Sequence, residues 1–259
     1  MGEIRFDDGA AYERYMGQWS QQAGSVFLDW LALPSALRWL DVGCGNGAFT
    51  ELIVDRCVPS AVSGVDPSDA QLAFARARLG SRGVQLRPGN AMSLPFAADT
   101  FDVAVMPLVI FFVPDPALGV AEMARVVNRG GTVAAYAWDL LGGGFPYALV
   151  QAELRAMGYD VPMPPSADAG GVDRLRALWS GAGLDGVETR EISVLRKYDG
   201  FDDFWTTAMG GPSLKSQLGA LDPADATQLK ERLRAQLPGD GAGRISMRAR
   251  ANAVKGRVQ

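Results

Sequence analysis

The fold is decided by the stretch WLDVGCGNGAFT, which occupies residues 39–50. An apolar run from residue 37 to residue 42 breaks into alternating glycines, and apolar residues then return at helical spacing. This order predicts a β-strand, a tight turn and an α-helix. Glycine suits such a turn because a Cβ would block the approach of the backbone to a ligand and the φ values of the turn. The stretch therefore predicts a nucleotide-binding turn.

The charges around the glycines narrow the choice of ligand. The spacing Gly43-x-Gly45-x-x-Ala48 also fits the fingerprint of a dinucleotide site. However, Asp41 ends the strand, and no Lys or Arg lies between Asp41 and Thr50. A pyrophosphate would meet a carboxylate without a cationic partner, whereas a ligand that carries an ammonium and a sulfonium would be attracted. The turn therefore favours a cationic adenosyl ligand.

The glycine turn resembles the motif acidic-x-Gly-x-Gly-x-Gly of class I S-adenosylmethionine-dependent methyltransferases, formed here by Asp41, Gly43, Gly45 and Gly47. Three further segments follow in the order of that family, so the resemblance covers about residues 37–138. It is greatest for the small-molecule branch that is similar to ubiquinone and menaquinone methyltransferases. The resemblance implies S-adenosylmethionine as cofactor and a small-molecule acceptor.

The resemblance also implies where the cofactor lies. The second expected strand ends in Asp66, about 25 residues beyond Asp41, where an acid binds ribose hydroxyls in nucleotide folds. The alternative role for Asp66 is helix capping, which Ser68 already supplies. Many relatives carry Asp where this chain has Asn90, but an amide oxygen can still accept a hydrogen bond from adenine. The expected cofactor contacts are Tyr15, Trp19, Asp41, Gly43, Cys44, Gly45, Asp66, Pro67, Asn90, Ala91, Met92 and Pro107.

Strands and helices alternate at βαβ spacing as far as residue 138, which predicts a parallel sheet. Together with the resemblance, this predicts an α/β fold: a doubly wound, mostly parallel seven-stranded sheet with helices on both faces, an antiparallel last strand and a helical cap insertion. Glycines 142–144 predict a flexible break. The expected units are a helical lid (1–36), the cofactor-binding core (37–138), connecting helices and a strand (139–200), the cap (201–240) and the final strand (241–259).

Two parts of this plan leave alternatives open. In the lid, Tyr15 and Trp19 share one helical face, which suits either core packing or a cover over the cofactor. In the final strand, Arg248, Arg250 and Asn252 alternate with small apolar residues. A solvated outer face is favoured there over a phosphate site.

The composition excludes several classes of function. A formal net charge of −4 and a pI of about 5.0 argue against nucleic acid or an anionic membrane as partner. No apolar run is long enough to span a bilayer and the N-terminal residues lack a signal pattern, so a cytoplasmic location is expected. With two cysteines and no histidine, neither a disulfide framework nor a metal site is expected. The sequence does not determine the oligomeric state.

Methyl transfer suits a chain without histidine. A sulfonium is already a good leaving group, so the enzyme mainly has to align the nucleophile and exclude water. If the acceptor needs deprotonation, the candidates are Asp139, Tyr136 and Tyr147. Apolar residues near the strand ends and in the cap predict the walls of an apolar acceptor pocket: Phe111, Phe112, Trp138, Phe204 and Trp205.

Two rival functions follow from the same residues. One is a protein that binds S-adenosylmethionine without turnover and has a regulatory role. The other is an NAD(P)-dependent oxidoreductase, which is disfavoured by Asp41 and by the lack of a Tyr-x-x-x-Lys pair for hydride transfer. The acidic charge balance disfavours a tRNA methyltransferase.

Overall fold

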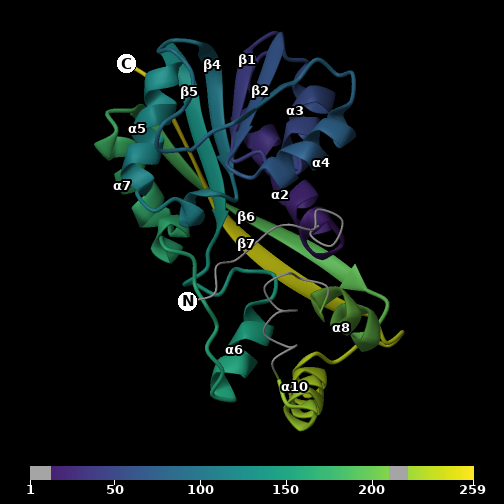
Figure 1. The fold of residues 1–259 in the computed structure, drawn as a ribbon. Helices are drawn as coiled ribbons and strands as arrows, with labels where there is room; N and C mark the ends of the chain where they lie inside the picture. Colours follow the sequence, from purple (N-terminus) through teal and green to yellow (C-terminus); the bar gives the residue numbers. More distant parts are fainter. Residues whose placement is uncertain (1–12, 210–220) are drawn as a thin grey trace.

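The computed structural model describes residues 13–209 and 221–259. One seven-stranded sheet runs through it in the order β3-β2-β1-β4-β5-β7-β6, with helices on both faces (Figure 1). The strands are β1 (Arg38–Val42), β2 (Ala61–Asp66), β3 (Gln85–Pro88), β4 (Phe101–Pro107), β5 (Val127–Trp138), β6 (Asp185–Tyr198) and β7 (Ile245–Arg257).

The helices alternate with these strands through the first half of the chain. The α-helices are α2 (Gln18–Leu31), α3 (Ala48–Cys57), α4 (Asp69–Leu79), α5 (Pro116–Val126), α6 (Ala148–Ala156), α7 (Val172–Gly181), α8 (Phe201–Met209) and α10 (Pro223–Gln236). Three short elements complete the set: the π-helix η1 (Glu13–Gly17) and the 3-10 helices η2 (Ile110–Phe112) and η3 (Ala167–Gly170). The cap helix expected at residues 213–218 lies outside the described residues.

The sheet has the predicted strand directions. β1 pairs in parallel with β2 and β4, β2 with β3, and β4 with β5. β7 is antiparallel to both β5 and β6. The expectation of a mostly parallel sheet with an antiparallel last strand is therefore confirmed. The carboxyl ends of the parallel strands consequently meet at one edge of the sheet, which is where ligands bind in open α/β folds.

Side-chain caps start three of the helices, and the first of them is the cap predicted at Ser68. The Ser68 hydroxyl accepts from the Gln71 N–H, and the Asp115 carboxylate accepts from the Leu118 N–H. Asp222 caps α10 in the same way. Each cap satisfies one of the backbone donors that the first turn of a helix leaves without a partner.

The helices form two layers around the sheet. α2, α3 and α4 cover one face, and α5 and α7 cover the other (Figure 1). Phe27 of α2 packs on Tyr136 of β5 with 4.8 Å between ring centroids, so the expected lid helix is part of the core. Burial of each large side chain of this kind contributes about 1.5 to 3 kcal/mol.

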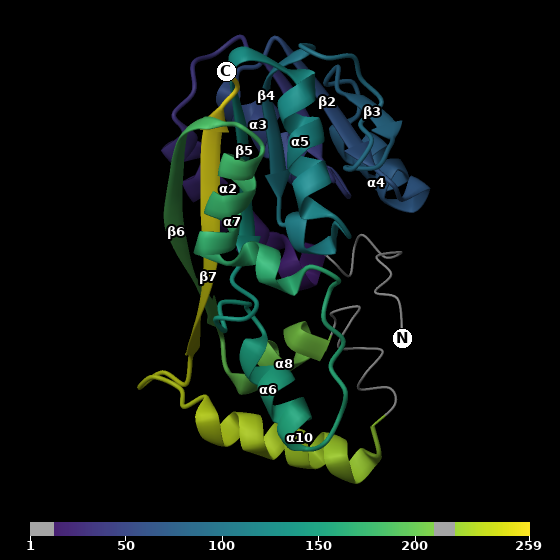
Figure 2. The same ribbon diagram turned by 90° about the vertical axis from the view of Figure 1, so that its left-hand side faces the viewer.

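The last two strands extend beyond the rest of the sheet and carry the cap. β7 pairs with β6 from Ile245 onward but with β5 only from Ala251 onward. The remainder is a two-stranded ribbon, and Figure 2 shows α6, α8 and α10 grouped beside it, beyond the end of the sheet. Glu153 of α6 ties this cap together, because its carboxylate forms an ion pair with Arg232 and accepts a hydrogen bond from Gln236, both of α10 and each at 2.6 Å.

Two expectations for this region are wrong. Glycines 142–144 form a clamped turn rather than a flexible break, because Asp139 accepts from the Gly142 N–H at 3.0 Å and pairs with Arg250 at 2.6 Å. The solvated face expected for the final strand holds for Arg248, which is exposed, and Arg250 keeps 38% of its side chain exposed while it pairs with Asp139, but the expectation is wrong for Asn252. Asn252 is buried and donates to the Gly170 carbonyl at 2.9 Å, since β7 lies inside the sheet with η3 and α7 against it.

We expect Gly144→Ala to destabilise the protein by about 1 to 3 kcal/mol in urea unfolding. A Cβ at residue 144 would lie 2.4 Å from the carbonyl oxygen of Arg250. This backbone cannot easily move, because the Arg250 N–H donates to the Gly144 carbonyl at 2.8 Å. Gly241→Ala is the control, since a Cβ there has no neighbour within 4 Å, and it should be neutral or slightly stabilising. Equal unfolding free energies for the two variants would contradict the clamped turn.

Candidate functional site

The glycine turn adopts a backbone that only glycine accommodates easily. Gly43, Gly45 and Gly47 have φ values of 76°, 52° and 80°. A Cβ on Gly43 would lie 2.5 Å from the side chain of Val109, so this glycine permits close packing. A Cβ on Gly45 would have no protein atom closer than 3.8 Å, so the backbone there is open to a ligand.

Asp41 lies behind this turn at the end of β1 and is fully buried. Its Oδ2 accepts from the hydroxyl of Thr50 at 2.6 Å, and its Oδ1 is buried with no hydrogen-bond partner among residues 13–209 and 221–259. Burial raises the pKa of Asp41 to about 7, while the Thr50 hydrogen bond lowers it and the charge of Asp66 raises it further. A cationic donor at Oδ1 would satisfy this carboxylate.

Cys44 packs inside the turn. Its Sγ would lie 2.9 Å from a Cβ built on Gly64 of β2, so sulfur fills the space that this glycine leaves. Burial raises the pKa of the Cys44 thiol, which keeps it protonated and unreactive. Only its backbone is therefore suited to contact a ligand.

Asp66 joins the end of β2 to the glycine turn. Its Oδ2 accepts from the Gly45 N–H and its Oδ1 from the Ser68 N–H, both at 2.9 Å. Burial raises its pKa, and these two hydrogen bonds oppose the rise. Each carboxylate oxygen keeps a second lone pair, which suits the expected contact with ribose hydroxyls. The exposed Pro67 follows directly.

The loop after β3 has a structured tip. The Asn90 side-chain oxygen accepts from the Met92 N–H at 2.9 Å, and the Asn90 carbonyl accepts from the Ser93 N–H at 3.0 Å. The amide oxygen that we expect to meet adenine thus also holds the turn that presents Ala91 and Met92. Its second lone pair is compatible with both roles, and the adenine contact stays a prediction.

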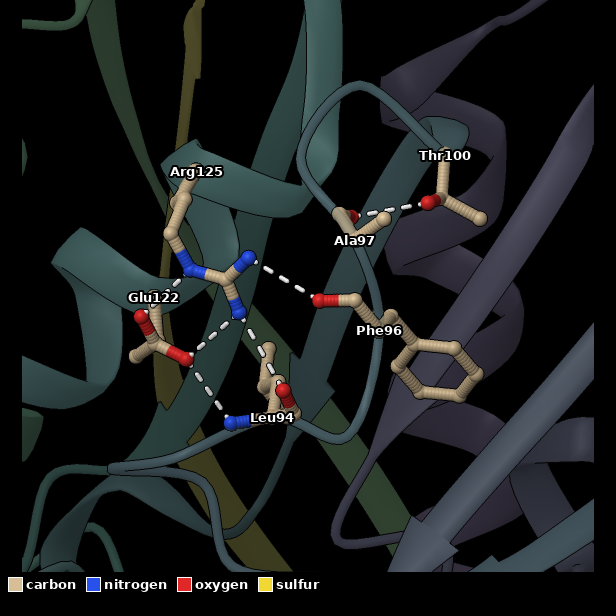
Figure 3. Close-up of polar contacts among 6 residues, drawn as sticks. All are labelled: Leu94, Phe96, Ala97, Thr100, Glu122 and Arg125. Carbon is tan, nitrogen blue, oxygen red and sulfur yellow. Dashed lines mark hydrogen bonds and ion pairs between the residues drawn. The ribbon is translucent and has the colours of Figure 1, made fainter.

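An ion pair on α5 fixes the continuation of this loop (Figure 3). Glu122 accepts from the Leu94 N–H at 2.8 Å and pairs with Arg125 at 2.6 Å. Arg125 in turn donates to the carbonyls of Leu94 and Phe96 at 3.1 and 2.9 Å. This contact was not predicted, because α5 and the loop lie far apart in the sequence.

The end of β4 has a strained backbone at the site. Leu108, which follows Pro107, has φ of 60°, and its N–H donates to the Tyr136 carbonyl at 2.7 Å. Positive φ is unusual for a bulky residue, so the sequence gives no signal for it. This turn directs Val109 against Gly43. The Thr50 contact was also missed, although a polar residue on the strand-facing side of α3 could have indicated it.

The expected lid packs on the connecting segment. The rings of Tyr15 and Tyr147 stack with centroids 4.2 Å apart, and the Tyr147 hydroxyl donates to the Tyr15 carbonyl at 2.9 Å. Trp19 is fully buried. Tyr15 lies in η1, and π-helical turns occur frequently at functional sites. Core packing of these aromatics is therefore observed, and contact with the cofactor stays a prediction.

The three candidate bases all have structural contacts. Asp139 pairs with Arg250, Tyr147 donates its proton to the Tyr15 carbonyl, and the ring of Tyr136 lies between Phe27 and the helix α3. Burial raises the pKa of Tyr147, which opposes its ionisation. No catalytic base is assigned.

The expected pocket walls do not all face one space. Phe204 packs near Tyr147 and Tyr198, with centroid separations of 6.4 and 5.4 Å. Trp205 instead stacks on Phe201 and lies 5.8 Å from the ammonium of Lys230, so it faces α10. Trp138 and Phe111 are buried, while Phe112 is 36% exposed beside Phe111.

The sheet order, the glycine turn and the two carboxylates at the strand ends resemble those of class I S-adenosylmethionine-dependent methyltransferases. Residues 40–135 match the family model described as a methyltransferase domain, so the chain carries this domain. The structure is similar to that of the YcgJ protein from Bacillus subtilis, with a TM-score of 0.60, 17% identity and coverage of 92% of this chain and 99% of that one.

Curated relatives match part of the chain. Over 116 residues the chain is 40% identical to 2-methyl-6-phytyl-1,4-hydroquinone methyltransferase 2, chloroplastic, of Oryza sativa subsp. japonica, covering 44% of this chain and 33% of that protein. Over 103 residues it is 37% identical to the demethylmenaquinone methyltransferase of Bacillus licheniformis, covering 39% of this chain and 44% of that protein. The chain thus spans less than half the length of these two relatives.

Two further observations concern the described residues alone. None of their helices is long and apolar enough to cross a membrane. Within the same ranges, no group of three or more Cys, Asp or Glu side chains is arranged to hold a metal ion.

We expect the affinity for S-adenosylmethionine to rise about tenfold between about pH 6 and about pH 8. The reason is that the pKa of Asp41 near 7 leaves the carboxyl neutral at the lower pH, and a cationic ligand must displace its proton. Calorimetry in buffers with different ionisation enthalpies should show proton release. Asp41→Asn should bind more weakly and without this pH dependence.

The same raised pKa of Asp41 determines how the stability of the ligand-free protein changes with pH. The folded state holds the Asp41 proton more tightly than the unfolded state, whose pKa is near 3.8. The bound proton therefore stabilises the folded state at low pH. Without ligand, the free energy of unfolding should fall as the pH rises from about 4 to about 7. For the binding prediction, a wild-type affinity for S-adenosylmethionine that does not change with pH would contradict the placement of the cation at Asp41.

Proposed function

We propose that the protein transfers a methyl group from S-adenosylmethionine to a small, partly apolar acceptor. The observation that carries this proposal is the buried Asp41 carboxylate, whose Oδ1 has no partner in the described chain, behind the open backbone at Gly45. A carboxylate in this position suits an ammonium or sulfonium and opposes a pyrophosphate. The proposal includes a cytoplasmic location, which rests on the composition alone.

Each part of the site has a task in this function. Asp41 would hold the cationic end of the cofactor, Asp66 its ribose, and residues 90–92 its adenine. Tyr15 and Trp19 would cover it and exclude water. The cofactor, when bound, supplies a methyl group on a sulfonium that needs no further activation. The chain therefore has to bind and orient the acceptor, and no covalent enzyme intermediate is needed.

The names of the curated relatives favour a hydroquinone-like acceptor, since two of them are methyltransferases of a phytyl hydroquinone and of demethylmenaquinone. The buried aromatic side chains Phe111, Trp138 and Phe204 suit a ring of this kind. The net charge of −4 also favours a small molecule over nucleic acid.

The function is tested by calorimetry followed by turnover. S-adenosylmethionine and S-adenosylhomocysteine should bind with micromolar affinity, whereas NADH should not bind. Labelled S-adenosylmethionine is then incubated with a methylated benzohydroquinone as acceptor probe, and labelled product is counted. Binding with no transfer to any hydroquinone would favour the regulatory alternative, and binding of NADH alone would favour an oxidoreductase.

We expect Asp66→Asn to weaken S-adenosylmethionine binding about tenfold or more, because a charge-assisted hydrogen bond is worth about 1.5 to 3 kcal/mol. The amide retains an oxygen that can accept from the Gly45 N–H, so the turn should survive. Asp69→Asn is the matched control, since Asp69 is an exposed acid close by in the first turn of α4. Wild-type affinity in a folded Asp66→Asn protein would mean that the ribose lies elsewhere.

A further inference from the structure

A cluster of hydrogen-bond donors lies beneath η1, between the sheet and the cap. We define the donor cluster as Trp19, Arg196 and Tyr198. Arg196 and Tyr198 are at alternate positions of β6 and therefore point to the same face of the sheet. This is the face that α2 covers, because α2 packs on β6.

Arg196 is a half-buried cation that forms no ion pair with the described residues. No carboxylate in residues 13–209 or 221–259 lies within ion-pair distance of its guanidinium. Its Nη1 donates to the Tyr15 carbonyl at 3.4 Å, and its Cζ lies 4.7 Å from the ring centroid of Tyr198. Its Nε is buried and makes no hydrogen bond with the described chain. A guanidinium stays charged at every physiological pH, so burial without a counter-charge costs free energy.

The two aromatic members add neutral donors. Trp19 is fully buried and Tyr198 is 1% exposed. The Nε1 of Trp19 and the hydroxyl of Tyr198 find no hydrogen-bond acceptor with good geometry in the described chain. The groups are close together, since Arg196 lies over the ring of Tyr198. Burial raises the pKa of Tyr198, while hydrogen bonds with the Tyr147 hydroxyl and the Trp19 indole and the charge of Arg196 lower it.

One cation that pairs with no carboxylate of residues 13–209 and 221–259, with two buried neutral donors beside it, has the chemistry of an oxyanion site. The walls are aromatic, since Phe204 and Tyr147 pack beside Tyr198. We infer that the donor cluster binds an acidic oxygen, a carboxylate or phenolate, of a small aromatic acceptor. This inference rests on the proposed function and specifies its substrate class. Because the cluster is buried, η1 must move to admit the acceptor.

The test uses benzoate as the anionic probe and benzamide as its neutral counterpart of the same shape. Each is titrated calorimetrically into the full-length protein, both with and without S-adenosylhomocysteine. Benzoate should bind about tenfold or more tightly than benzamide, the difference that charge-assisted hydrogen bonds produce. Arg196→Gln should abolish the preference, and Arg196→Lys, which keeps the charge, should retain part of it.

Arg190→Gln is the matched control, since Arg190 is an exposed residue on the same face of β6. It should keep the wild-type preference. Equal affinities for the two probes, unchanged benzoate binding in Arg196→Gln, or no benzoate binding at all would each overturn the inference. A failure of S-adenosylhomocysteine to bind would instead count against the proposed function. The two failures are distinguishable, because benzoate binding is also measured without S-adenosylhomocysteine.

Discussion

The site depends on a carboxylate that the fold buries completely. Asp41 lies at the end of β1 with one oxygen bound to Thr50 and the other without a partner in the described chain. Burial of a charge in this way is unfavourable, and the pKa near 7 expresses that cost. A ligand that brings a positive charge offsets it. The polarity of the site is thus set by the strand end itself.

The second constraint is the linkage between neighbouring strand ends. Asp66 accepts backbone hydrogen bonds from the glycine turn and from the start of α4, so β1, β2 and α4 meet at one carboxylate. Glu122 and Arg125 hold the next loop in a similar way. Segments that would contact three parts of an adenosyl ligand are therefore fixed by polar contacts before any ligand binds, which lowers the entropy cost of binding.

The cap is attached to this core through the ribbon of β6 and β7. Because both strands continue past β5, side chains from one sheet face reach the region beneath η1. The same geometry brings Arg250 to Asp139 and so clamps the turn that leads to α6. The region beneath η1 consequently combines Trp19 of α2 with Arg196 and Tyr198 of β6, which lie more than a hundred positions further along the sequence.

The sequence by itself determined the succession of the strands along the chain and their directions, the glycine turn, the start of α4 and the identity of the two strand-end carboxylates. These follow from local signals: apolar periodicity, helix caps and glycines at positions of positive φ. The tertiary structure alone decided that Leu108 takes a positive φ, that Trp205 turns toward α10 rather than toward Tyr147, that Arg250 pairs with Asp139 and that Asn252 is buried. Those outcomes depend on contacts between distant segments, and a local pattern carries no information about which side chain a distant segment will bring.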